Sequence, residues 1–136
     1  MQEVTTRDTA DMLEIMALVY ACAEATDQRN PESFAGCYTS DGVFDRSGRV
    51  FVGHADIAKG LQERAEGLQR RHIFSNLRIV IEGEGKATGS GYCLVFDHQT
   101  GGPAGTPPII ADFSDQYAKV GNAWKIRKRV VRRAFQ

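Results

Sequence analysis

Several classes of protein are excluded by what this sequence lacks. No apolar run approaches the roughly 18–20 residues that a membrane span needs, and residues 1–12 show no basic segment followed by an apolar one. Glycine-rich GxGxxG and Walker motifs are missing. The three cysteines, Cys22, Cys37 and Cys93, form no CxxC pair. We therefore expect a cytoplasmic protein with reduced core thiols, no membrane contact and no bound cofactor.

Histidine is also scarce. The chain has three histidines, His54, His72 and His98, and none is spaced as HxH or HxxxH. Metal sites need several such ligands close together, so we predict no metal. His54 is expected at the start of a helix and His98 at a solvated strand end, which leaves His72 as the candidate for chemistry.

Net charge is zero, but it is unevenly distributed. Residues 1–68 carry 6 Lys/Arg and 12 Asp/Glu, whereas residues 69–136 carry 11 and 5. The two halves should attract each other within one domain spanning 1–136, a length that allows one sizeable core. The basic segment 125–133 could suggest nucleic-acid binding, but its charges alternate with Ile126, Val130 and Val131. This pattern is typical of a strand with one solvated face, and it lacks interleaved aromatics, so we expect no nucleic-acid partner.

Periodicity predicts an α+β fold. Helices are expected over residues 8–27, 31–38 and 55–66, with residues 39–42 forming a turn. A hairpin of residues 43–46 and 50–52 should precede the third helix. Long strands are expected over 71–82, 86–96, 109–120 and 124–134, with a Gly/Pro-rich loop at 98–108. Antiparallel strands covered on one face by helices would form a strongly curved sheet, a cone with an interior pocket. Gly89 and Gly91 mark the expected point of bending or close approach.

Asp27 is the most informative single residue. It lies on the apolar stripe of the first helix, in line with Met12, Met16, Val19 and Ala23. A carboxylate there points toward the core, and it lies at the helix C-terminus, where the macrodipole disfavours negative charge. A buried partner or a function is the usual reason for such a placement, although a solvated helix end would also accommodate it.

His72 opens the long strand that we take to be central in the sheet. Strict alternation puts His72, Phe74, Asn76, Arg78 and Val80 on one face. Alone, His72 could be a surface histidine at a strand end. Together, Asp27 and His72 could meet in the pocket, where the carboxylate would fix the imidazole tautomer and leave the other nitrogen as a general base.

Several segments together are typical of one family: Tyr20 and Asp27, FDRSGRVFVG (44–53) with Ile57, RHIFSNLRI (71–79), Asp115-Gln116-Tyr117, and GNAWKI (121–126) leading to Arg129. Through them the chain resembles the SnoaL-like branch of the NTF2-like superfamily. Within that branch it is similar to scytalone dehydratase, bile-acid 7α-dehydratase and hexachlorocyclohexane dehydrochlorinase. There are departures: Cys22 stands where the bile-acid enzyme has its catalytic tyrosine, and no histidine lies in 86–96 or 109–120 to match the second one of scytalone dehydratase.

The resemblance implies an NTF2-like cone of three N-terminal helices packed on a mostly antiparallel sheet. It also implies a lyase or isomerase that needs no cofactor and acts on a small hydrophobic cyclic or polyketide-like molecule. Asp27 and His72 would form the catalytic dyad, with Arg129 as a polar catalytic group or, alternatively, only an ion-pair partner for the acidic half. We expect Tyr20, Phe74 and Asn76 to contact the substrate. A homodimer or homotrimer is implied as well, and a non-catalytic binding or accessory module is the alternative function.

Overall fold

The computed structural model describes residues 5–103 and 107–135. Two helices, α1 (Thr6–Asp27) and α2 (Pro31–Gly36), precede the hairpin of β1 (Tyr38–Arg46) and β2 (Arg49–Val52). Helix α3 (Gly53–Gln62) follows the hairpin, so only two of the three helices are N-terminal to the sheet. The remaining elements are strands, β3 (Leu68–Gly83), β4 (Lys86–Gln99), β5 (Ile109–Val120) and β6 (Ala123–Arg133).

Most predicted elements are confirmed, and their ends need correction. The turn expected at 39–42 is wrong: these residues belong to β1, whose pairing with β6 is irregular between Tyr38 and Val43. Strand β4 continues to Gln99, which shortens the loop predicted at 98–108; residues 104–106 of that loop lie outside the described residues. Residues 39–42 form the irregular stretch itself, and the pairs on either side, Tyr38 with Ile126 and Val43 with Lys128, keep them within the strand despite their turn propensity.

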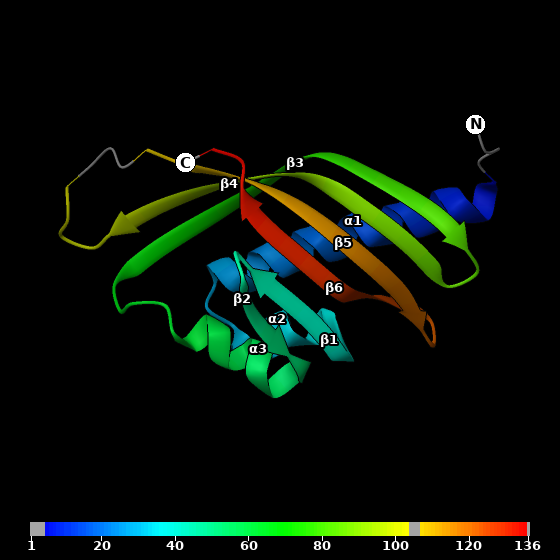
Figure 1. The fold of residues 1–136 in the computed structure, drawn as a ribbon, viewed down its shortest axis with the longest axis horizontal. Helices are drawn as coiled ribbons and strands as arrows, with labels where there is room; N and C mark the ends of the chain where they lie inside the picture. The colour runs from blue at the N-terminus through cyan, green and yellow to red at the C-terminus, as the bar shows by residue number, and fades with distance from the viewer. Residues whose placement is uncertain (1–4, 104–106, 136) are drawn as a thin grey trace.

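Helix α1 begins with a capping box and crosses the sheet. Thr5 and Asp8 exchange side-chain-to-backbone hydrogen bonds of 3.0 and 3.3 Å, which satisfy free N–H groups of the first turn. Ile15, Val19 and Cys22 are fully or almost fully buried, and α1 packs mainly against β3. Figure 1 shows the helix running across one face of the sheet. No helix in the described ranges is long and apolar enough to cross a bilayer.

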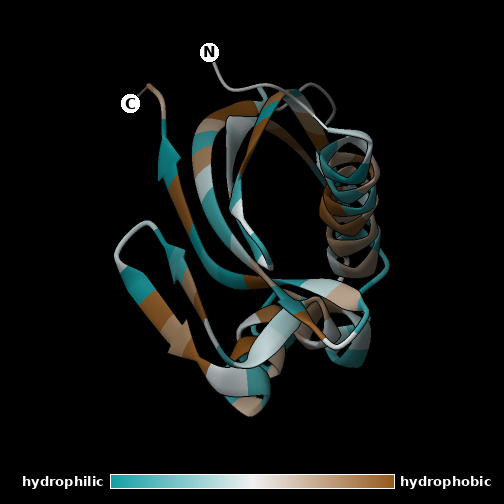
Figure 2. Ribbon diagram, turned by 90° about the vertical axis from the view of Figure 1, so that its right-hand side faces the viewer, coloured by the Kyte–Doolittle hydropathy of each residue, from teal (hydrophilic) through white to brown (hydrophobic). Residues whose placement is uncertain are grey.

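The sheet has the strand order β2-β1-β6-β5-β4-β3 and is not closed into a barrel. Only β1 and β6 pair in parallel; the other neighbours are antiparallel. Strand β3 is therefore an edge strand, and its predicted central position is wrong. Figure 2 shows the sheet curving around the side that α1 occupies. Because β3 lies at the edge, it has backbone groups that no strand pairs on its outer side, and α1 reaches it there.

A β-bulge in β3 changes which side chains face the interior. Ser75 pairs with Tyr92 and Arg78 with Ser90, so residues 76 and 77 together oppose Gly91. Asn76 takes the left-handed conformation that this requires, with a φ of 55°. Beyond the bulge the alternation inverts, and Leu77, Ile79 and Ile81 join Phe74 on the core side. Strict alternation through residue 80 was therefore wrong.

Gly91 is fitted closely against its neighbours, as predicted for close approach. A Cβ atom there would lie 2.8 Å from the Ser75 carbonyl oxygen and 2.9 Å from the Phe113 ring. We expect Gly91→Ala to lower the free energy of unfolding by about 1–3 kcal/mol, because the backbone oxygen cannot move aside without disturbing the bulge. Gly36→Ala is the matched control, since nothing lies within 4 Å of its added Cβ. Urea unfolding of both variants measures the difference, and equal stabilities would contradict the account.

Candidate functional site

A cavity of about 520 Å³ lies between the curved sheet, α1 and α3. Its apolar wall comes from Phe34, Phe44, Leu61, Phe74 and other core side chains. The cavity is less apolar than the predicted pocket, because six arginines and one glutamate also line it: Arg46, Arg49, Arg64, Arg70, Arg129, Arg133 and Glu63. The volume suits a small organic ligand, for which pockets of about 300–1,000 Å³ are usual.

The contact expected between Asp27 and His72 is present; His72 lines this cavity, whereas Asp27 lines a shallower groove that His72 also borders. His72 Nδ1 lies 2.6 Å from Asp27 Oδ1, and the backbone N–H of His72 donates to Asp27 Oδ2 over 3.1 Å. The Asp27 side chain is 12% exposed and the His72 side chain is 15% exposed. A carboxylate only accepts hydrogen bonds when ionised, so it selects the tautomer with the proton on Nδ1. Nε2 makes no hydrogen bond to any described residue, and His72 lines the cavity.

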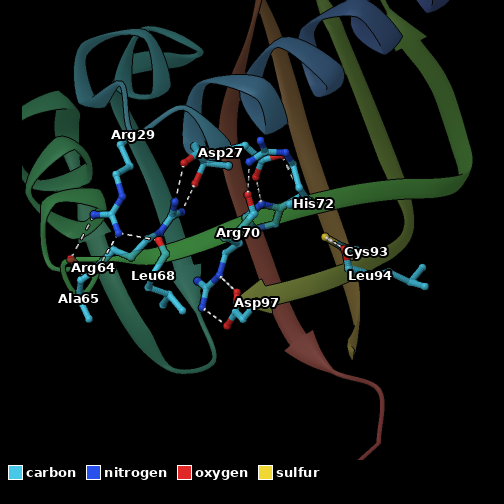
Figure 3. A network of polar contacts seen from close by, with 12 residues as sticks. Asp27, Arg29, Arg64, Ala65, Leu68, Arg70, His72, Cys93, Leu94 and Asp97 are labelled. Atoms are coloured by element: carbon cyan, nitrogen blue, oxygen red, sulfur yellow. Dashed lines mark hydrogen bonds and ion pairs between the residues drawn. The ribbon is translucent and has the colours of Figure 1, made fainter. Parts of the chain in front are cut away.

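The end of α1 is tied to the chain before β3, which fixes the position of Asp27. Arg64 donates to the carbonyl and hydroxyl oxygens of Thr26 over 2.8 and 2.9 Å. Arg29 donates to the carbonyl oxygens of Ala65 and Leu68, both over 2.6 Å. The Arg64 bond satisfies a carbonyl at the end of α1, which has no basic residue in its own last turn. The Arg29 bonds satisfy carbonyls of the segment that leads into β3. Figure 3 shows the network around Asp27.

Phe74 and Arg129 continue the cavity wall beyond His72. The Phe74 ring lies between the His72 ring, 6.3 Å away between centroids, and the Arg129 guanidinium, 5.1 Å from the Phe74 centroid. Arg129 is 3% exposed and binds Asp115 through two hydrogen bonds of 2.8 and 2.7 Å. The alternative of an ion pair with the acidic N-terminal half is wrong, because the partner comes from the neighbouring strand β5.

The positive charge of Arg129 is balanced by the carboxylate of Asp115. Burial disfavours the charged guanidinium, but the opposite charge of Asp115 outweighs it and holds the pKa of Arg129 well above its ordinary value. The Tyr117 hydroxyl also donates to Asp115, over 2.7 Å. Burial, together with the charge of Asp115, raises the pKa of Tyr117, so this hydroxyl stays protonated. Arg129 is thus a permanently cationic group held in one orientation at the cavity.

Two of the predicted substrate contacts are not in the cavity. Tyr20 is 46% exposed and borders a shallower groove between α1 and β3, which Asp27 and His72 also border. Asn76 is exposed on the bulge, where it accepts a hydrogen bond of 2.8 Å from Ser75. The bulge turns Asn76 away from the face that carries His72 and Phe74, so both contacts are wrong for this cavity.

All three cysteines are buried free thiols, as predicted. Cys22 and Cys93 line the cavity. Burial raises the pKa of Cys93 to about 11, which keeps it protonated and a poor nucleophile near neutral pH. Within the described residues no group of three or more His, Cys, Asp or Glu side chains is arranged to hold a metal ion. His54 binds the Tyr38 carbonyl oxygen, 2.8 Å away, and His98 is exposed.

That Arg46, Arg49 and Arg70 line the cavity was not predicted from the sequence; the end of the cavity where they lie is called its mouth below. Leu68, Arg70, His72 and Phe74 alternate along β3 and all line the cavity. Had the predicted strand begun at residue 68 instead of 71, the same alternation would have identified Arg70. Arg46 and Arg49 flank the β1–β2 turn, and no sequence signal places that turn beside the site. Arg70 binds Asp97 of β4 through two hydrogen bonds of 2.5 and 2.7 Å.

The Arg70–Asp97 pair makes stability depend on pH. The hydrogen bond from Arg70 lowers the pKa of Asp97 below its ordinary value. A carboxyl group whose pKa is depressed by folding stabilises the protein above its unfolded-state pKa of about 3.9, and this contribution is lost as pH falls through the folded-state value. We expect the stability difference between wild type and Asp97→Asn to be present at about pH 7 and to shrink below about pH 4. Urea unfolding at the two pH values measures it; a difference that grows in acid would contradict the assignment.

The fold and the site define a cone of helices on a curved sheet, with a cavity lined by a histidine whose Nδ1 atom contacts Asp27. The chain belongs to the SnoaL-like domain family, whose sequence profile matches residues 7–130. No curated protein sequence matches the chain significantly.

Solved structures share this fold. A variant of Rv3472 from Mycobacterium tuberculosis, a protein of unknown function, superposes with a TM-score of 0.87 at 24% identity, covering 99% of this chain and 79% of that one. A proposed scytalone dehydratase from Novosphingobium aromaticivorans gives a TM-score of 0.83 at 20% identity, with 94% and 87% covered. A Catenulispora acidiphila protein in complex with S-DNPA gives 0.78 at 25% identity, with 92% and 94% covered.

Proposed function

We propose that this protein is a cofactor-free lyase or isomerase, of the dehydratase or dehydrohalogenase type, that acts on a small, largely apolar cyclic molecule in the 520 Å³ cavity. The proposal rests chiefly on one observation, the 2.6 Å contact of Asp27 with His72, the histidine that lines the cavity. Family membership and the complex of a similar protein with S-DNPA support a small-molecule ligand.

In the proposed step, Nε2 of His72 removes a proton from a substrate carbon. The C–H electron pair becomes the new double bond, and the leaving group departs from the neighbouring carbon with its own bonding pair. Asp27 holds the imidazole by Nδ1 and stabilises the cation formed when Nε2 takes the proton. If the leaving group is hydroxide, the imidazolium returns the proton to it, and water is released.

In this proposal Arg129 stabilises the negative charge that develops during the step. A guanidinium has five N–H donors. Two bind Asp115 and one points to Cys22 Sγ, 3.6 Å away, which leaves two for the cavity. Because Asp115 holds the group rigidly, it would need little reorganisation as an oxyanion forms. Asn76, which we expected to contact the substrate, does not line the cavity and is not proposed for this role.

Carbon deprotonation can be tested with labelled substrates. A panel of cyclic β-hydroxy ketones and halogenated rings, each with and without deuterium at the acidic carbon, would be assayed for turnover. We expect at least one member to be converted with a primary isotope effect on kcat/KM. Turnover without an isotope effect, combined with incorporation of solvent oxygen, would indicate hydrolysis and contradict the proposed step.

A non-catalytic binding module remains the second candidate, because Asp27 also binds the backbone N–H of His72 on the edge strand. In that case the pair would serve to attach α1 to β3, and removing either partner would cost a few kcal/mol. An active-site role predicts that Asp27→Asn leaves the free energy of unfolding within about 1 kcal/mol of wild type, since active-site groups are seldom optimal for stability. Chemical unfolding of the variant distinguishes the two: a loss of several kcal/mol favours the structural role.

A further inference from the structure

The mouth of the cavity carries more positive than negative charge. Arg46 and Arg49 share a single carboxylate, Glu63, which among the described residues is the only acidic side chain that lines the cavity. Arg64 binds only neutral oxygens of Thr26, and Arg133 makes no ion pair within the described residues. By contrast, Arg70 and Arg129 each have a carboxylate of their own.

The two arginines of the β1–β2 turn are held close together. Both guanidinium groups lie over the same Phe51 ring, 5.2 and 5.1 Å from its centroid. Partial burial, followed by the like charge of Arg49, lowers the pKa of Arg46. Their side chains are nevertheless 39% and 58% exposed, so an incoming ligand can reach them. An anion beside this pair would relieve the repulsion and accept charge-assisted hydrogen bonds.

This charge lies toward one end of the cavity. Arg46 pairs with Val131 of β6, and Arg133 lies two residues further along the same strand, so both are at one end of the cavity. Arg70 is on that side of His72, two residues or about 7 Å away along β3. Apolar side chains, among them Phe44, Leu68 and Val95, line the space between.

We infer that the natural ligand is an amphiphilic organic anion, with a carboxylate, phenolate or similar group bound by Arg46 and Arg49 at the mouth and an apolar ring in the interior beside His72. This inference rests on the proposed function only in taking the cavity as the ligand site. It names the substrate class, and it also predicts which end of the substrate faces the base.

Two fluorescent probes with the same ring system test this inference. 8-Anilinonaphthalene-1-sulfonate carries an anionic group, and N-phenyl-1-naphthylamine is its neutral counterpart. We expect the sulfonate to bind wild-type protein about tenfold more tightly at low ionic strength, and added salt should reduce this preference. Equal affinities would overturn the inference.

Substitutions locate the preference. Arg46→Gln and Arg49→Gln should each weaken sulfonate binding about five- to tenfold without changing binding of the neutral probe, whereas Glu63→Gln should strengthen sulfonate binding. Arg127→Gln, on an exposed residue outside the cavity, is the matched control. Tyr92, exposed on the other face of the sheet, tests surface binding through Tyr92→Ser. A preference that survives both cavity arginine changes, or that is lost only with Tyr92→Ser, would overturn the assignment.

The probe experiment is independent of catalysis. His72→Gln should bind both probes as wild type does, because it keeps the arginines and the cavity. Failure of the dyad as a base would therefore leave the probe preference intact, and loss of the preference would leave the dyad untouched. Thermal unfolding of each variant verifies that it is folded before its affinities are compared.

Discussion

His72→Gln is expected to lower kcat/KM by a factor of about 10²–10⁴ on any substrate of this protein, because it removes the proposed general base. Glutamine occupies a similar volume and can still donate a hydrogen bond to Asp27, so the free energy of unfolding should change by less than about 1 kcal/mol. Steady-state kinetics on a substrate found in the labelled panel, together with urea unfolding, measures both quantities.

The control for this prediction is His98→Gln, which makes the same chemical change at an exposed residue of β4 outside the cavity. It should retain wild-type kcat/KM. Asp27→Asn should lower kcat without removing the base, because the amide stabilises the imidazolium less than a carboxylate does. Full activity in His72→Gln would exclude His72 from the mechanism, and equal losses in both histidine variants would point to a nonspecific effect.

Asp115→Ala is expected to give the largest loss of stability, about 3–5 kcal/mol, because it leaves Arg129 as a buried charge without a partner. Both side chains are almost inaccessible, at 4% for Arg129 and 0% for Asp115, so solvent cannot replace the lost interaction. Tyr117 would also lose the acceptor of its hydroxyl. Urea unfolding at neutral pH measures the loss. A change below 1 kcal/mol would show that the pair is solvated or dispensable.

The double variant Asp115→Leu/Arg129→Met separates structure from chemistry. Replacing a whole buried ion pair by apolar side chains of similar volume is often neutral for stability. We therefore expect the double variant to recover most of the stability lost in Asp115→Ala. If Arg129 also stabilises charge in the reaction, activity should remain low despite that recovery, by roughly 10²-fold. Recovery of both would assign Arg129 a structural role only.

Much of the fold followed from residue patterns. The stripe through Val19 and Ala23 identified the face of α1 that is buried, and the position of Asp27 on it indicated a partner on the sheet. The long strands were recognised because alternation and turn residues agree there. These signals are local, so they were readable one segment at a time.

Errors arose where the decisive contact lies between distant segments. The bulge at Asn76 depends on what β4 presents opposite it, Gly91, and it decided that Leu77 rather than Asn76 continues the interior face. Asn is among the few residues that tolerate a positive φ, which was the only local hint. Tyr20 was selected by resemblance, but the helix turns it outward, to 46% exposure. The position of β3 at the edge depends on the whole strand order.

The most direct test of the Asp27–His72 assignment is the tautomer of His72, read by ¹⁵N NMR of histidine-labelled protein under mildly alkaline conditions where imidazoles are neutral. A carboxylate acceptor at Nδ1 predicts a protonated Nδ1 and a bare Nε2, and Asp27→Ala should abolish that preference. Finding the proton on Nε2 in the wild type, or an unchanged tautomer in Asp27→Ala, would contradict it.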